Sequence, residues 1–144
     1  MAHNTTLPTS LASAFRKMEW RVTKVHDEAL KPFGVNMYQA MSLIYVAWYG
    51  QKETVNQRSI EKYLYLSNPG VSKIVAFLEK EGYITREPDP KDARSYILTA
   101  TADGLAFAEK LNEAILKADS IIMEPLDREE QQQLLRLLVK IGQE

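Results

Sequence analysis

The sequence contains no cysteine and only two histidines, His3 and His26, among its 144 residues. The lack of cysteine excludes disulfides, thiolate nucleophiles, cysteine-based redox sensing and zinc–thiolate sites. The two histidines are far apart and form neither an HxxxH nor an HExxH pair, so the sequence predicts no metal site. No catalytic acid–base pair or nucleophile is visible either, so we expect neither an enzyme nor a bound cofactor.

Long apolar runs are also missing. None reaches the roughly 20 residues that cross a bilayer, and the chain does not open with a signal-peptide pattern. We therefore expect no membrane partner and a cytoplasmic protein, which fits the lack of cysteine.

Charge is nearly balanced, at a formal net charge of -1, but it is unevenly distributed. Lysine and arginine outnumber acidic residues over positions 1–99, whereas acidic residues predominate over 100–144. A bound nucleic acid would therefore face the first two thirds of the chain. Solvated helix faces produce similar charge runs, so the asymmetry by itself decides nothing.

Helical periodicity dominates the rest of the sequence. Apolar residues at steps of three and four, beginning with Leu11 and Phe15, predict a first helix over about 10–30. Further helices are predicted from Asn36 to Gly50, after Asn56, over about 69–80, from Thr101 to about Met123, and after Asp127. Capping signals mark several starts, namely the pairs Asn36 with Gln39 and Asp127 with Glu130, and Asn68 followed by Pro69.

Between the fourth and fifth helices, two strand-like runs flank a polar segment. "YITRE" and "SYILT" predict a β-hairpin whose loop would hold seven residues, from Pro88 to Arg94. A two-stranded hairpin is marginal alone and must lean on helices. The predicted fold class is thus mainly α with a small β-hairpin, in the order of a winged helix-turn-helix.

The fourth helix has two distinct faces. If Val71, Ile74, Val75 and Leu78 point inward, the outer face carries Pro69, Ser72, Lys73, Ala76 and Lys80. Small residues permit close approach to a DNA groove, lysine attracts phosphate, and serine can bond a base edge. An ordinary solvated face explains the same pattern equally well.

The hairpin favours the DNA hypothesis. A loop with Lys91 and Arg94 after a candidate recognition helix suits a wing that reaches a minor groove. A solvated turn with a local Asp–Arg pair is the alternative.

Three segments resemble the MarR family of bacterial transcription regulators. They are "VSKIVAFLEKEGYI" at the recognition helix, "DPKDARSYILT" at the wing and "TADG" at the next helix. The resemblance extends to the helix order over nearly the whole chain. It implies a winged helix-turn-helix flanked by N- and C-terminal dimerisation helices, with a dimerisation part at 1–34, a DNA-binding domain at 35–100 with its wing at about 83–99, and a second dimerisation part at 101–144.

The resemblance also implies site residues and partners. Double-stranded DNA would be contacted by Asn68, Pro69, Gly70, Ser72, Lys73, Ala76, Arg86, Lys91, Asp92 and Arg94. In this set Arg94 enters the minor groove and Asp92 orients the wing. Pro69 and Gly70 stand where the family often has serine or threonine, which shifts base contacts toward Asn68, Ser72 and Lys73. Ala100 replaces a larger aliphatic residue and implies looser packing beneath the wing.

The resemblance implies a homodimeric repressor of a pseudo-palindromic operator, with release by a small aromatic or weak-acid effector. Candidate effector residues are Trp20, Tyr38, Met41 and Tyr45. The pattern of these large side chains favours a core or a dimer interface over a ligand site. His26 is expected on a helix surface or in an interface. A winged-helix module that binds proteins without specific DNA binding is the alternative function.

Overall fold

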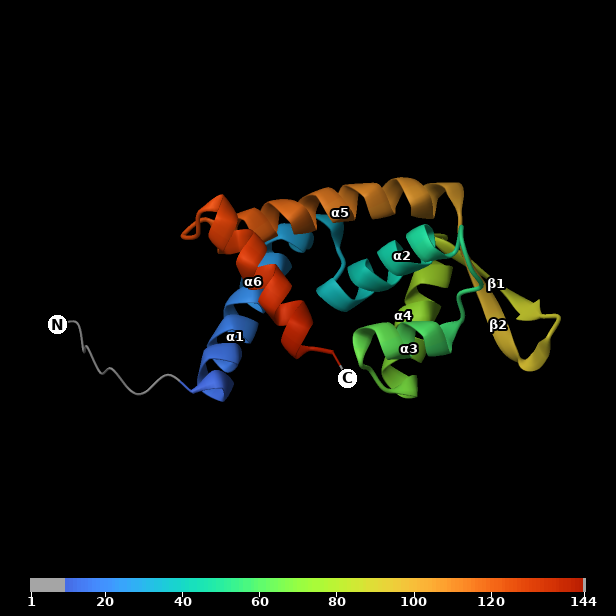
Figure 1. Cartoon of the computed structure of the whole chain (residues 1–144). Helices are drawn as coiled ribbons and strands as arrows, with labels where there is room; N and C mark the ends of the chain where they lie inside the picture. Colours follow the sequence, from blue (N-terminus) through green and yellow to red (C-terminus); the bar gives the residue numbers. More distant parts are fainter. Residues whose placement is uncertain (1–9, 144) are drawn as a thin grey trace.

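The protein is described from a computed structural model that covers residues 10–143. In chain order its elements are α1 (Leu11–Leu30), the short 3₁₀ helix η1 (Lys31–Phe33), α2 (Met37–Tyr49), α3 (Gln57–Leu64), α4 (Asn68–Lys80), β1 (Ile84–Asp89), β2 (Asp92–Ala100), α5 (Ala102–Met123) and α6 (Arg128–Ile141). The hairpin lies at one end of the molecule, α1 and α6 lie at the other, and α5 runs along one side between them (Figure 1). His3 lies outside the described residues.

Local capping explains where most helices begin. Asn36 and Gln39 form a reciprocal capping box at the start of α2, as predicted, with bonds of 2.9 and 3.0 Å. Asp127 and Glu130 form the predicted box at α6, where the Glu130 backbone N–H lowers the pKa of Asp127 and keeps this carboxylate charged. Asn56 caps α3 as expected, with Ser59 as its partner.

One apolar core joins α2, α3, α4, the hairpin and α5. Its largest fully buried side chains include one or more from each of these elements: Leu43, Ile60, Val71, Leu78, Ile84, Leu98 and Leu111. Burying each side chain of this size stabilises the fold by about 1.5–3 kcal/mol relative to exposure. The predicted inward face of α4, with Val71, Ile74, Val75 and Leu78, is buried here. The core therefore holds the outer face of α4 toward solvent.

The start of α5 is clamped to the segment between α4 and β1. The Thr101 hydroxyl donates to the Gly82 carbonyl at 2.7 Å, and the Thr101 N–H donates to the Tyr83 carbonyl at 3.0 Å. A Cβ on Gly104 would lie 2.0 Å from the Tyr83 carbonyl oxygen, so only glycine permits this approach. The hairpin base is held on the other side, where the Leu98 N–H donates to the Val55 carbonyl at 2.8 Å.

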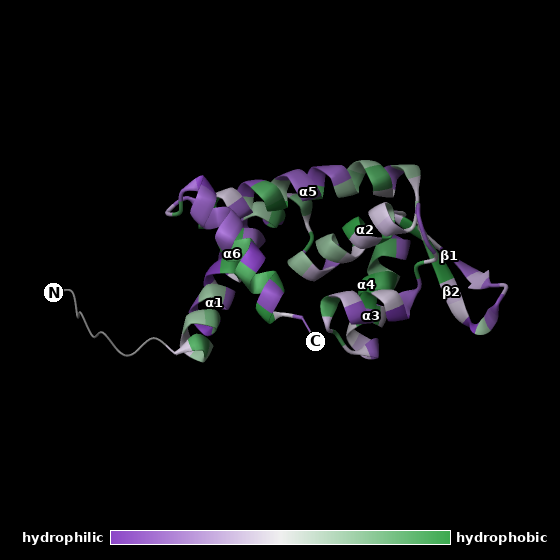
Figure 2. Cartoon of the chain, viewed as in Figure 1, coloured by the Kyte–Doolittle hydropathy of each residue, from purple (hydrophilic) through white to green (hydrophobic). Residues whose placement is uncertain are grey.

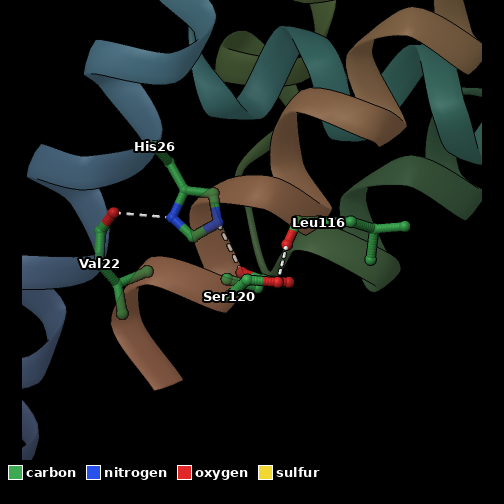
Figure 3. Close-up of polar contacts among 5 residues, drawn as sticks. Val22, His26, Leu116 and Ser120 are labelled. Atoms are coloured by element: carbon green, nitrogen blue, oxygen red, sulfur yellow. Dashed lines mark hydrogen bonds and ion pairs between the residues drawn. The ribbon is translucent and has the colours of Figure 1, made fainter. Parts of the chain in front are cut away.

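A buried polar contact joins α1 to α5 (Figure 3). His26 is 2% exposed, and its ring nitrogens lie 2.7 Å from the Val22 carbonyl oxygen and 2.8 Å from Asp119 Oδ1. The expectation of a surface or interface histidine is therefore wrong. Helical spacing places His26 beside the buried Leu30, and the partner carboxylate, which satisfies its second nitrogen, lies 93 positions away in the sequence.

Two further expectations are corrected. Helix α4 begins at Asn68 rather than at Pro69, and its N-cap is Ser67, whose backbone is extended, rather than Asn68. The hairpin has no seven-residue loop, because only Pro90 and Lys91 lie between the strands. Instead the register jumps from the pair Pro88–Tyr96 to the pair Asp89–Asp92, and a bulge in β2 takes up residues 93–95.

Two glycine substitutions test the clamp at α5. Gly104→Ala should lower the free energy of unfolding by about 3 kcal/mol, since the new methyl group meets a backbone carbonyl that cannot rotate away. Gly70→Ala is the matched control, because its Cβ would meet only ordinary contact, 3.7 Å from Ser67 Oγ. In a helix this control should gain about 0.5–1 kcal/mol. Urea unfolding measures both, and equal stabilities for the two variants would contradict the clamp.

Candidate nucleic-acid interface

Helix α4 exposes the residues that were predicted to face DNA. Pro69, Ser72, Lys73 and Ala76 are exposed along its outer side, as are Asn68 and Lys80, and Gly70 is half-buried. The Ser67 side chain makes no cap bond, so the backbone N–H groups of the first turn remain open to an anion. The outer side thus combines small residues, two cations and an open helix end.

Gln57, the first residue of α3, fixes part of this face. Its Nε2 donates to Ser72 Oγ at 2.8 Å and to the Asn68 carbonyl oxygen at 3.3 Å. Sequence analysis did not identify Gln57, because nothing local signals a bond between residues 15 positions apart on two different helices.

The wing tip is built from two aspartates that bond the backbone. Asp89 Oδ1 accepts from the Lys91 N–H at 2.8 Å, and Asp92 Oδ1 accepts from the Arg94 N–H at 3.0 Å. Arg94 lies within the β2 bulge and is exposed. In residues 10–143 no lysine or arginine side chain lies within ion-pair distance of a carboxylate, so neither Lys91 nor Arg94 is held in an ion pair. The local Asp–Arg ion pair that the sequence left open is absent from this part of the chain.

Closer to the hairpin base, Arg86 stacks on Tyr96. The guanidinium carbon lies 4.4 Å from the ring centroid, and the register puts both side chains on the strand face that carries the buried Leu98. Stacking of this kind is worth about 0.5–1 kcal/mol at an exposed site and leaves the guanidinium N–H groups free for phosphate. Arg86 was among the predicted DNA contacts but Tyr96 was not, because strand register decides which side chains meet.

The four candidate effector residues do not converge into one site. Trp20 is 65% exposed and has Lys24 over its ring, while Tyr38 is 51% exposed and Met41 is half-buried. Tyr45 instead stacks between two tyrosines that the sequence analysis did not include, Tyr49 at 4.7 Å and Tyr63 at 4.6 Å between ring centroids.

These stacked rings line an open hollow of about 390 Å³ together with Ser59 and Lys62. Burial raises the pKa of the Tyr45 phenol, and the nearby charge of Glu53 raises it further. Burial likewise raises the pKa of Tyr63. Both rings therefore stay neutral near pH 7 and can donate a hydrogen bond from the hydroxyl.

Within residues 10–143, no helix has both the length and the apolar character that a membrane crossing requires.

Comparisons with known proteins identify the family. A family model described as "MarR family" matches residues 45–96, which run from α2 through both short helices into the wing. The HTH-type transcriptional regulator BilQ of Clostridium symbiosum is 31% identical over 100 residues, covering 69% of this chain and 69% of that protein.

Solved structures agree with the fold. The transcriptional repressor CouR bound to a 23-mer DNA duplex superposes with a TM-score of 0.83 at 24% identity, covering 93% of each chain. The S. aureus MepR–DNA complex gives a TM-score of 0.81 at 24% identity, covering 92% of this chain and 96% of that one. The predicted winged helix-turn-helix is thus confirmed, and the chain belongs to the MarR family of transcriptional regulators.

Proposed function

We propose that this regulator binds double-stranded DNA in a sequence-specific manner, with α4 in the major groove and the wing in the adjacent minor groove. The observation that carries the proposal is a set of unpaired cations on one lobe. Lys73 and Lys80 lie on the outer side of α4, and Lys91 and Arg94 lie at the wing tip. CouR and MepR, which share the fold, are described as bound to DNA.

Individual roles follow from position and chemistry. Ser72 and Asn68 would meet base edges, while Lys73 would meet phosphate. Pro69, Gly70 and Ala76 have small side chains, which leave room for DNA to approach the helix closely. In the wing, Arg86 and Lys91 would contact phosphate and Arg94 would enter the minor groove, with Asp92 holding the bulge that carries it.

We further propose a homodimer in which residues 1–34 and 101–144 form the dimerisation part and residues 35–100 form the DNA-binding domain. Hydrophobic residues recur along α1, α5 and α6 (Figure 2), and several large ones have exposed side chains. They are Leu11, Phe15 and Met18 on α1, Leu116 and Ile121 on α5, and Leu134, Leu135, Leu137, Leu138, Val139 and Ile141 on α6. No residue of α6 is buried, so this amphipathic helix has no packing partner for its apolar face among residues 10–143.

A two-fold dimer would set two copies of α4 about 34–36 Å apart, which is one helical turn of DNA, on a pseudo-palindromic operator. CouR is named a repressor. We propose that this protein is also a repressor, which blocks transcription by binding over a promoter.

The proposed effector is a small aromatic or weak acid. Tyr45 and Tyr63 offer neutral phenol hydroxyls and Lys62 offers a cation beside the hollow that they line. Tyr38 and Met41 extend the same face of α2. Trp20 is on a separate helix and would join this site only across the proposed dimer.

Removing the wing arginine tests the DNA-binding mode. Arg94→Ala should weaken binding to the preferred DNA by about 1–3 kcal/mol with little change in stability, because this side chain is exposed. Fluorescence anisotropy on labelled duplex measures the affinity. Arg128→Ala, which removes an exposed arginine from the first turn of α6, is the matched control and should bind as the wild type does. If Arg94→Ala binds DNA with unchanged affinity, the wing arginine is not part of the DNA interface and the proposed binding mode is wrong.

The dimer is tested by equilibrium sedimentation. The wild type should sediment at twice the chain mass of 16.4 kDa. Leu138→Asp should shift it toward the monomer, because a charge would be buried among apolar side chains. Leu105→Asp is the matched control, since Leu105 is equally exposed at 37% but lies at the opposite end of α5 from α6. A folded wild-type monomer would contradict the proposal.

Effector release is tested with benzoate and 4-hydroxybenzoate. Either acid should dissociate the wild-type protein from DNA with a saturable dose response. Tyr45→Leu should raise the concentration needed by roughly tenfold, the loss expected for one hydrogen bond to a charged group. Tyr65→Leu, which removes an exposed ring that does not line the hollow, should respond as the wild type does. If neither acid affects DNA binding, the proposed effector class is wrong.

A further inference from the structure

The side-chain amide of Gln57 uses both of its hydrogens at the surface of α4. Its contact with Asn68 is made to a backbone carbonyl, which can only accept. The NH₂ end of the amide must therefore face α4, which fixes its orientation. One hydrogen goes to the Asn68 carbonyl and the other to Ser72 Oγ, 2.8 Å away.

This arrangement occupies one of the two acceptor lone pairs of Ser72 Oγ and so biases the hydroxyl toward donation. Because Nε2 donates to Ser72 Oγ, the serine oxygen acts as acceptor toward α3. Among residues 10–143, Ser72 Oγ has no other hydrogen-bond partner, so its own hydrogen is available outside the protein. Ser72 is exposed on the outer side of α4, which in the proposed function faces the major groove.

We propose that Gln57 is a positioning residue for DNA sequence recognition, which presents Ser72 to the groove as a hydrogen-bond donor. This inference rests on the proposed DNA binding. A free serine hydroxyl can donate or accept and therefore discriminates weakly between bases. A serine held as donor selects base acceptors, which are N7 of either purine, O6 of guanine and O4 of thymine. Cytosine presents only a donor, N4, which could reach only the one remaining lone pair of Ser72 Oγ and would leave the serine hydrogen without a base partner, so cytosine is disfavoured at that position.

The geometry also separates this role from a direct contact by Gln57. Both amide hydrogens are used within the protein, so Gln57 could contact a base directly only through Oε1, which accepts and therefore would favour the bases that Ser72 disfavours. Its influence on base choice should then pass through Ser72. In a Ser72→Ala background, removing Gln57 should cost no further discrimination, which is the expected result of a double-mutant cycle for coupled residues.

The experiment begins with a pool of duplexes that carry a randomised core, from which the full-length wild-type protein selects its preferred sequence. Single-base variants of that duplex are then measured by anisotropy with wild type, Gln57→Leu, Ser72→Ala and the double variant. Gln51→Leu is the matched control, because Gln51 bonds only the Ala47 carbonyl at the end of α2. Circular dichroism checks that each variant is folded, and Gln57→Ala provides a second, smaller replacement.

We expect one position per half-site where the wild type binds a duplex with cytosine about 2- to 10-fold more weakly than one with thymine. This ratio corresponds to the net free energy of one hydrogen bond. Each single variant should reduce the difference in affinity between thymine and cytosine at the same position. The double variant should reduce it no further than either single variant does. The salt dependence should be unchanged, because no charge is removed. Gln51→Leu should keep the wild-type profile.

Three results would overturn the inference while leaving DNA binding intact. One is a wild-type profile in Gln57→Leu and Gln57→Ala. Another is a loss of discrimination on changing Gln57 that persists in the Ser72→Ala background. The third is a profile in which no position depends on Ser72. Failure of the wild type to enrich any sequence would instead overturn the proposed function itself.

Discussion

The close approach of α5 to the backbone at Tyr83 is the constraint on which the DNA-binding lobe depends. Three hydrogen bonds meet there: from Thr101 to Gly82, from Thr101 to Tyr83, and from Gly104 back to the Thr101 hydroxyl. Because Gly104 has no side chain, α5 can start directly against the chain that leaves α4. The same short segment connects α4 to the hairpin, so one junction sets the wing, the recognition helix and the long helix relative to one another.

Charge placement on this lobe is consistent with a polyanion partner despite the net charge of -1. At the wing tip the two aspartates bond backbone N–H groups and stabilise the turn, and in the described residues neither forms an ion pair with Lys91 or Arg94, so both cationic side chains are free to reach a phosphate. Acidic residues outnumber lysine and arginine over residues 100–144, which form α5, α6 and the turns beside them. A proposed effector site beside Tyr45 and Tyr63 would lie against α3, whose first residue holds the outer face of α4.

The sequence predicted the helix order, the capping boxes and the two faces of α4, because these depend on residues within one or two turns of each other. It mispredicted the hairpin loop, since a bulge in β2 rather than a long loop takes up residues 93–95. It also missed contacts between distant residues, such as Gln57 with Ser72, Tyr96 with Arg86, and Asp119 with His26. Those pairs arise only when the elements pack, and no local pattern specifies them. The family resemblance supplied the candidate DNA residues, and the bonding among them came from the structure.

The most direct test of this account is the affinity of the wild-type protein for DNA from upstream of its own gene, compared with scrambled DNA of equal length. Fluorescence anisotropy would be measured across a series of salt concentrations. The account predicts tighter binding to the upstream DNA and a logarithm of affinity that falls linearly with the logarithm of salt concentration, as phosphate counterions are released. Weak binding that is equal for both duplexes and insensitive to salt would contradict it.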